Sequence, residues 1–179
     1  MTPGEVIDFW FDEIDASAWY RADDALDTTI RERFGHTHQA AGRGELFSWR
    51  RSAPGRLAEI VVLDQFSRNI HRGSALAFAG DALALVLAQE AVAAGAPAAL
   101  PPAQRCMLYM PFMHSESPLI HEVSLTLFSE PGMEDNLEYA RAHAAVIEEF
   151  GRYPHRNAAL GRASTPAELA YLERPGSGF

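Results

Sequence analysis

The residues with the clearest chemical potential stand in three polar segments, each of which adjoins an apolar run. The segments are "DQFSRNIHRG" at 64–73, "MHSES" at 113–117 and "EEFGRYPHRN" at 148–157. Arginine offers a planar fork of donors that suits a carboxylate or a phosphate, and asparagine both donates and accepts hydrogen bonds. Carboxylates beside histidines can move protons when their environments separate their pKa values. The three segments therefore contain the chemistry of a site that holds an anion.

The candidate residues follow from these side-chain types. The groups that could move protons are Asp64, His114, Glu116 and His155. The groups that could bind an anionic ligand are Arg68, Asn69, Arg72, Arg152, Arg156 and Asn157. Nothing in the segments identifies an activated nucleophile, because Ser115 and Ser117 stand near His114 without a GxSxG motif.

The apolar runs beside these segments determine where the polar groups can lie. In "LAEIVVLDQFSRN", residues 57–63 are apolar apart from Glu59, which is typical of a buried helix. Polar groups that begin near a core need partners, because each unmet group costs about 1–3 kcal/mol. We therefore expect one connected cluster of Asp64, Arg68, His114, Glu116, Arg152, His155 and Arg156.

The charge count within the three segments motivates an anionic ligand. Four arginines stand against two carboxylates in "DQFSRNIHRG", "HSES" and "GRYPHRN". This count leaves positive charge over even when the histidines are neutral, so we expect a pocket that is open to an anion.

Three functional interpretations remain open from the residues alone. The first is a binding domain for an anionic small molecule or a peptide carboxylate. The second is an enzyme in which a histidine–carboxylate pair performs acid–base chemistry on a small anionic substrate. The third is a structural polar network in a protein-interaction module that uses Trp10, Trp19 or Trp49. The third has a physical basis, because Arg and His near helix C-termini bind the last carbonyls and suit the helix dipole.

Composition argues against several cofactors and partners. All 15 basic residues are arginine, so no lysine can form a Schiff base, anchor pyridoxal phosphate or complete a Walker-A loop. No GxGxxG supports a Rossmann site, and we expect no cofactor. The net charge of -9 and the lack of a basic run argue against nucleic acid as a partner.

Metal binding is also not expected. Cys106 is the single cysteine, which excludes an intrachain disulfide and a multi-cysteine metal site. His36 and His38 are two positions apart and would diverge on a helix. A set of His114, Glu116 and His121 is conceivable, but no HExxH motif accompanies it.

The chain is expected to be a soluble, cytoplasmic protein with no membrane partner. The start "MTPGEVIDFW" lacks the features of a signal peptide. The most apolar region, around "ALALVLAQEAVAAG", is interrupted by Asp81, Gln89 and Glu90, and we expect it to be too short and too polar to span a bilayer.

The elements that must position the candidate residues are helices. Capping signals open the chain at "TPGE" and return at "TPAE". Apolar residues recur at helical spacing over about 23–41, and further helices are expected to start near Pro54 and Pro102 and to stop at Gly95 and Gly151. No segment shows convincing alternation with period two. At 179 residues, the chain is expected to be one domain, 1–179, with about eight or nine helices and no sheet.

Together, several motifs resemble a widespread, mainly bacterial family of uncharacterised proteins of unknown function. The motifs are "VIDFWF", "LDQFSRNIHRG", "MPFMHSES", "FGRYPHRNAALGR" and "STPAELAYL". The resemblance extends from about Val6 to Leu172, which is nearly the whole chain.

The resemblance implies a fold more than a function. It implies an all-α, tetratricopeptide-like (TPR-like) right-handed superhelix without a settled activity. Three positions depart from the family pattern: Ser67 stands where proline is frequent, His71 where an aromatic is common, and His121 where glutamine is expected. These departures affect the rim of the expected site, and hence its choice of ligand. Helical-repeat proteins usually bind peptides or protein segments on a concave face.

Overall fold

A computed structural model describes residues 1–19 and 21–178 of the chain. Within these residues the chain is helical and contains no β-strand, so the predicted all-α class is confirmed. The helices are α1 (Pro3–Asp8), α2 (Asp24–Gly42), α3 (Ala53–Val61), α4 (Ser67–Ile70), α5 (Asp81–Ala93), α6 (Pro102–Met113), α7 (Pro118–Phe128), α8 (Glu134–Phe150) and α9 (Pro166–Leu172).

The predicted helix boundaries agree closely with the structure. Thr2 and Thr165 each form a capping box with a glutamate three residues later, as "TPGE" and "TPAE" predict. Gly95 and Gly151 adopt left-handed φ angles of 72° and 68°, which only glycine reaches without strain, and each follows the end of a helix. Pro111 lies inside α6 and does not end the helix, which continues to Met113.

The central helix changes its winding where the first polar segment begins. Helix α3 passes without a break into the π-helix η4 (Val62–Phe66) and then into α4. A π-turn accommodates an extra residue and shifts all later side chains around the helix axis. Asp64, Arg68 and His71 therefore do not lie along one straight α-helical stripe, and the ring of His71 packs against His38 at a centroid distance of 5.3 Å.

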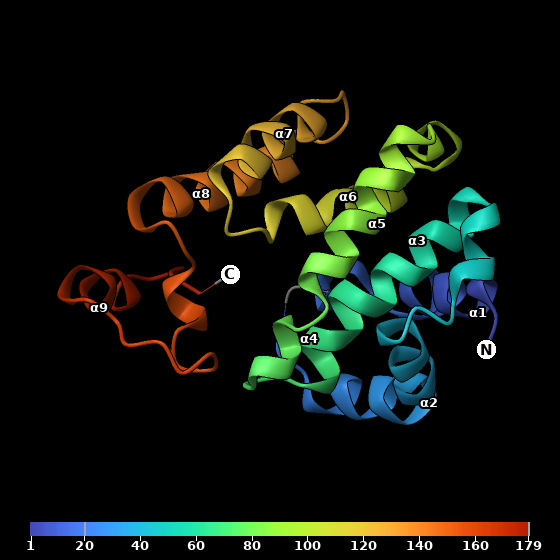
Figure 1. The fold of residues 1–179 in the computed structure, drawn as a ribbon, viewed down its shortest axis with the longest axis horizontal. Coiled ribbons are helices and arrows are strands. Elements are labelled where there is room, and N and C mark those ends of the chain that lie inside the picture. The colour runs from blue at the N-terminus through green and yellow to red at the C-terminus, as the bar shows by residue number, and fades with distance from the viewer. Residues whose placement is uncertain (20, 179) are drawn as a thin grey trace.

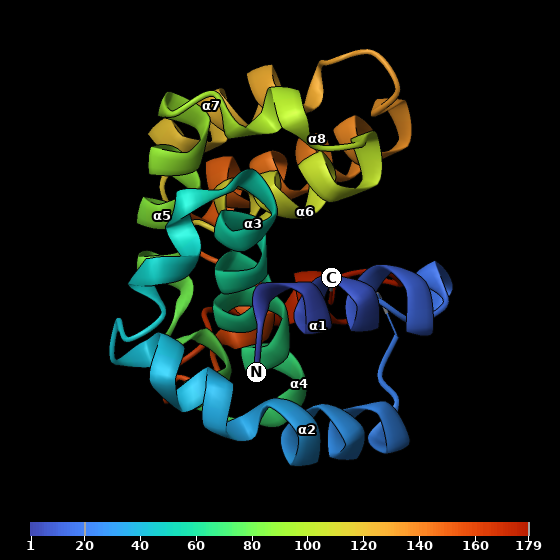
Figure 2. The ribbon, with the colours of Figure 1, turned by 90° about the vertical axis from the view of Figure 1, so that its right-hand side faces the viewer.

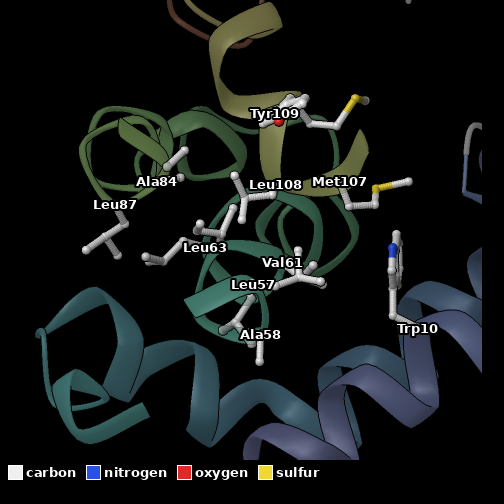
Figure 3. Close-up of a cluster of buried hydrophobic side chains, with 14 of the residues drawn as sticks. Trp10, Leu57, Ala58, Val61, Leu63, Ala84, Leu87, Met107, Leu108 and Tyr109 are labelled. Carbon is white, nitrogen blue, oxygen red and sulfur yellow. The ribbon is translucent and has the colours of Figure 1, made fainter. Parts of the chain in front are cut away.

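The main apolar core surrounds this central helix. Leu57, Val61 and Leu63 pack with Met107 and Leu108 of α6, and all five side chains are buried (Figure 3). Figures 1 and 2 show α7 and α8 at one end of the molecule and α2 at the other, with α3 between them. The core thus fixes the central helix and α6, whose C-terminal ends carry the first two polar segments.

A second, smaller apolar cluster supports the third polar segment. Val146 and Ile147 of α8 are buried with Tyr153, and Phe150 and Tyr171 pack against them. The Tyr153 hydroxyl donates to the Met113 carbonyl at 2.5 Å. Tyr153 and its neighbours therefore lie beside the end of α6.

One expectation about the apolar region around α5 needs correction. Residues Ala75–Ala93 have a mean hydropathy of 1.6 and are long and apolar enough to cross a membrane by length and composition, although 28% of the window is buried. The segment is therefore neither too short nor too polar for a span. Helix α5 packs against α3 and α6, and Asp81 at its start binds two arginines. The TPR-like superhelix and the single domain remain predictions.

Candidate functional site

The three polar segments meet in space, as predicted. His114 Nδ1 lies 2.7 Å from Asp64 Oδ1, which joins the second segment to the first. Arg156 donates to the His114 carbonyl at 3.0 Å, and Glu116 accepts from the Tyr153 N–H at 2.8 Å, which join the third segment to the second.

An inner cluster forms around Asp64, which is 1% exposed. Besides His114, its carboxylate receives the Gln65 amide at 2.6 Å and lies 3.2 Å from Arg68. Arg68 also forms a forked pair with Asp81, with distances of 3.0 and 3.1 Å. Asp81 in turn accepts from Arg156 at 3.1 Å. We use the term inner cluster for Asp64, Arg68, Asp81, His114 and Arg156.

Two aromatic rings enclose the Arg156 guanidinium. Its central carbon lies 4.7 Å from the centroid of Phe78 and 4.5 Å from that of Tyr153. Such contacts attract a cation to the ring face and hold the planar group in place. The Arg156 side chain is 7% exposed, so it acts as a fixed wall of the site.

A cavity of about 420 Å³ opens beside the inner cluster, and we call it the basic cavity. Arginine and histidine dominate its wall, and no Asp or Glu is among the described residues that line it. The charged and titratable lining residues are Arg21, Arg68, Arg72, Arg156, His114, His143 and His155. The neutral polar lining residues are Gln65 and Asn69, and Trp19 and Phe78 contribute aromatic surface.

A second cavity of about 330 Å³ lies behind Arg156 and His114. Unlike the basic cavity, it is lined by two carboxylates, Asp81 and Glu116. Arg156, His114 and Phe78 line both spaces and form the partition between them.

A separate carboxylate holds the rim of the basic cavity. Asp27 of α2 accepts from Arg72 through both of its oxygens, with Arg72 Nη2 at 2.8 Å, and from the Asn69 amide at 2.8 Å. Asp27 is 5% exposed, whereas the Arg72 side chain is 39% exposed. The carboxylate therefore lies behind Arg72 and Asn69, and the arginine reaches solvent.

Arg152 of the third segment belongs to a C-terminal cluster, which we define as Glu116, Arg152, Arg162 and Glu168. Arg162 forms a forked pair with Glu116 at 2.7 and 2.9 Å. Arg152 forms one with Glu168 at 2.6 and 2.8 Å. The Asn157 side chain donates to Ser164 Oγ and accepts from Arg162 Nε, at 3.0 Å in each case.

The expected single cluster is therefore divided. Asp64, Arg68, His114 and Arg156 are brought together, with His155 beside them on the cavity wall. Arg152 and Asn157 do not line either cavity and instead fix the loop after α8. Glu116 lines only the second cavity.

The sequence-based charge count omitted three carboxylates outside the three segments. Asp81 pairs with Arg68 and Arg156. Asp27 pairs with Arg72, and Glu168 pairs with Arg152. When these carboxylates are counted, the arginines of the three segments have no surplus of positive charge. The charges are instead separated in space, because Arg68, Arg72 and Arg156 lie on the cavity wall and the carboxylates lie behind them.

The protonation states follow from burial and from these neighbours. Burial alone would raise the pKa of Asp64, but Arg68 and the hydrogen bonds from His114 and Gln65 lower it well below its usual range. Burial and the positive charge of Arg68 lower the pKa of His114, although Asp64 opposes this effect. At neutral pH the pair is therefore an ionised carboxylate and a neutral imidazole whose Nδ1–H donates to Asp64.

The other histidines near Tyr153 are also neutral at pH 7. Burial, followed by Arg156, lowers the pKa of His155 to about 4. Burial lowers the pKa of His143 to about 3 and that of His121 below its usual value. Of these, His143 and His155 make the wall of the basic cavity polar without adding charge.

Among the described residues, no group of three or more His, Cys, Asp or Glu side chains is arranged to hold a metal ion. The expectation of no metal and no cofactor remains a prediction. Cys106 is buried in α6, and burial raises the pKa of its thiol to about 12.

Several residues of the site could not be selected from the sequence. Asp27, Asp81 and Phe78 lie outside the three segments. The hydrogen-bond partners of the two aspartates are 13 to 75 positions away, and Phe78 lies 78 positions from Arg156. Gln65 lies inside the motif "LDQFSRN", but the sequence does not show that its amide binds Asp64. Arg162 has the same bonding pattern as Arg152, and its place in "NAALGR" gave no signal of its own.

Fold and site define a class of all-helical protein with a basic cavity at the C-terminal ends of its central helices. The chain matches the family described as "Bacterial protein of unknown function (DUF924)" over residues 6–176, and it belongs to this family. This confirms the resemblance seen in the motifs.

The fold also has a solved counterpart. The structure of a protein of unknown function, ATU0120 from Agrobacterium tumefaciens, is similar with a TM-score of 0.90. It shares 37% sequence identity, and the match covers 96% of each chain. No curated protein matches this chain.

Proposed function

We propose that the protein binds a small anionic molecule in the basic cavity. The observation that carries this proposal is the composition of the wall, which has four arginines and no Asp or Glu among the described lining residues. The chain as a whole has a net charge of -9, so the basic wall is a local departure from an acidic protein. A concentrated positive wall raises the local concentration of anions and orients them.

The size of the cavity favours a small molecule over an extended peptide. A volume of about 420 Å³ is within the range of small-molecule sites, which span roughly 300–1,000 Å³. A peptide that offers only its terminal carboxylate would place one group inside and leave the rest outside. A peptide carboxylate therefore remains the second choice of ligand.

Arg21 offers the cleanest test of this proposal. Its side chain lines the cavity, is exposed, and makes no hydrogen bond or ion pair with the described residues. Replacing it should therefore leave folding unchanged. Phosphate, sulfate and small carboxylates are titrated while the melting temperature is followed, because a ligand that prefers the native state raises that temperature.

The expected result is a rise for the unaltered protein and a smaller rise for Arg21→Gln. Arg43→Gln is the matched control, because Arg43 is 61% exposed and pairs with Glu45 at 2.7 Å outside the cavity. The proposal fails if no anion raises the melting temperature, or if both variants respond like the unaltered protein. In that case the polar clusters are structural.

A second candidate function rests on the Asp64–His114 pair. The 2.7 Å contact fixes the imidazole, and the neutral ring can accept a proton through Nε2. This arrangement supports an enzyme that uses His114 as a general base on a bound anion. Hydrolysis of p-nitrophenyl phosphate and p-nitrophenyl acetate would test it, with His114→Gln expected to lower any rate by at least about 100-fold.

The remaining functional expectations concern location and partners. A cytoplasmic location, no nucleic-acid partner and no membrane partner rest on composition and remain predictions. The apolar segment 75–93 makes the membrane prediction the first of these to test, by flotation of the purified protein with lipid vesicles.

A further inference from the structure

Buried carboxylates fix the direction of three neutral side chains on the wall of the basic cavity. Asp64 receives His114 Nδ1 at 2.7 Å and Gln65 Nε2 at 2.6 Å. Asp27 receives Asn69 Nδ2 at 2.8 Å. An ionised carboxylate only accepts hydrogen bonds, so each of these neighbours must direct a donor toward it.

The opposite end of each side chain is consequently an acceptor. These ends are His114 Nε2, Gln65 Oε1 and Asn69 Oδ1, and none of them forms a hydrogen bond with a described residue. All three residues line the basic cavity, although Gln65 and Asn69 are only 6% and 7% exposed. None of the three acceptor atoms is among the fully buried polar atoms without a partner, so each keeps some exposure.

Acceptors and cationic donors share one stretch of chain. Gln65 and Asn69 are four residues apart, and Arg68 and Arg72 are also four residues apart, so the two kinds of group interleave along η4, α4 and the residues that follow. A simple inorganic anion such as sulfate would satisfy the arginines but has no hydroxyl group to donate to the acceptors.

We propose that the ligand is a small anion that also carries several free hydroxyl groups, of the sugar-phosphate or polyhydroxy-acid class. The anionic group binds the arginines, and the hydroxyl groups donate to His114 Nε2, Gln65 Oε1 and Asn69 Oδ1. The inference rests on the proposed anion site and adds recognition of the ligand's hydroxyl groups. Of two anions with equal charge, the protein should bind the one with hydroxyl groups more tightly.

Matched pairs of ligands separate charge from hydroxyl recognition. The probes are ribose 5-phosphate against n-butyl phosphate, and gluconate against hexanoate, with dissociation constants from calorimetry. The hydroxylated member of at least one pair should bind about ten-fold or more tightly, because a small number of added hydrogen bonds accounts for such a ratio. The preferred pair identifies the anionic group as phosphate or carboxylate.

Two variants test the acceptors individually. Gln65→Met leaves Asp64 with His114 and Arg68, and Asn69→Leu leaves Asp27 with the fork of Arg72, so neither abandons a buried charge. Each should weaken the hydroxylated ligand about five-fold, the value of one hydrogen bond, and change the plain anion less than two-fold. Gln39→Met is the control, because Gln39 is exposed on α2 and outside the cavity.

The outcomes distinguish the two levels of the proposal. If both members of each pair bind equally, hydroxyl recognition is overturned while the anion site stands. The same holds if the hydroxylated ligand is preferred but neither variant reduces the preference. If none of the four probes nor inorganic phosphate binds, the anion site and the hydroxyl inference both fail.

Discussion

The inner cluster and the C-terminal cluster both pair carboxylates with arginines but differ in how completely their polar groups are satisfied. In the C-terminal cluster, Glu116 and Glu168 each accept a forked arginine and a backbone N–H, from Tyr153 and Thr165 respectively. Every strong acceptor there has a partner from the protein. The cluster therefore stabilises the loop between α8 and α9 and leaves nothing for a ligand.

In the inner cluster, Asp64 binds two neutral side chains that have two polar ends, besides its pair with Arg68. Asp64 uses His114 and Gln65, and their second ends remain on the cavity wall. The difference teaches that a count of charges does not separate a binding site from a structural network. The distribution of partners does, because a network that binds a ligand keeps part of its hydrogen-bonding capacity directed outward.

The largest expected effect is the loss of Asp64. Asp64→Ala should lower the free energy of unfolding by about 3–5 kcal/mol, because it breaks a buried ionic network and leaves charge without its partner. Urea denaturation measures the change. Asp64→Asn keeps the side-chain volume and an acceptor for His114, so it should lower the free energy of unfolding by less. If both variants lose the same amount, the loss does not come from the ionic network.

A drop in pH should next affect His143 and His155, which line the basic cavity. The pKa of His155 is lowered to about 4 and that of His143 to about 3, so the unfolded chain binds more protons than the native protein below about pH 6.5. Stability should therefore fall from pH 6.5 toward pH 4, by about 2 kcal/mol for each histidine at pH 5. Melting temperatures across this range measure the slope.

A histidine variant identifies the source of that slope. His143→Phe should make it shallower between pH 6.5 and pH 4, because Phe does not titrate. At pH 8 the comparison with the unaltered protein separates packing from titration. A slope that is identical in both proteins would exclude His143 as a contributor.

Glu168 provides an effect of intermediate size that is confined to stability. Glu168→Gln should lower the free energy of unfolding by about 1.5–3 kcal/mol, because charge-assisted hydrogen bonds to Arg152 and the Thr165 cap are weakened. The loss is smaller than for Asp64, since the freed Arg152 is 29% exposed and can be hydrated. The melting-temperature response to anions should be unchanged, and a lost response would undermine the division into two clusters.

The smallest effect is expected for an exposed pair. Arg141 and Glu138 lie one turn apart on α8, with side chains 59% and 71% exposed. Arg141→Gln should change the free energy of unfolding by less than about 0.5 kcal/mol. Denaturation and anion titration of this variant set the background against which the other changes are judged.

Local features of the fold were predictable from the sequence because they depend on neighbouring residues. The capping boxes at Thr2 and Thr165 and the helix ends near Gly95 and Gly151 need only a few consecutive side chains. The meeting of the three segments was predictable for a related reason, since each adjoins an apolar helix that must be buried.

The partners of the arginines were not predictable in the same way. Asp81 lies 75 positions from Arg156, and Asp27 lies 45 positions from Arg72. Nothing local marks an aspartate at a helix start as the partner of a distant guanidinium. Arg152 was assigned to the ligand by its chemistry, but α9 supplies Glu168, and the arginine is held away from the cavity.

The π-helix η4 has a consequence for how this chain can change its length. One residue fewer between Val62 and Phe66 would let the central helix continue with ordinary α winding, and the apolar residues before it could stay in place. The side chains after the deletion would keep their directions, because the π-turn is what absorbs the extra residue. At the present length, ordinary α winding would instead turn every later side chain by about 100° around the axis. Arg68, Asn69 and Arg72 would then leave the wall together. Substitutions can alter that wall one group at a time, whereas loss of the π-turn without a deletion would remove it in one step.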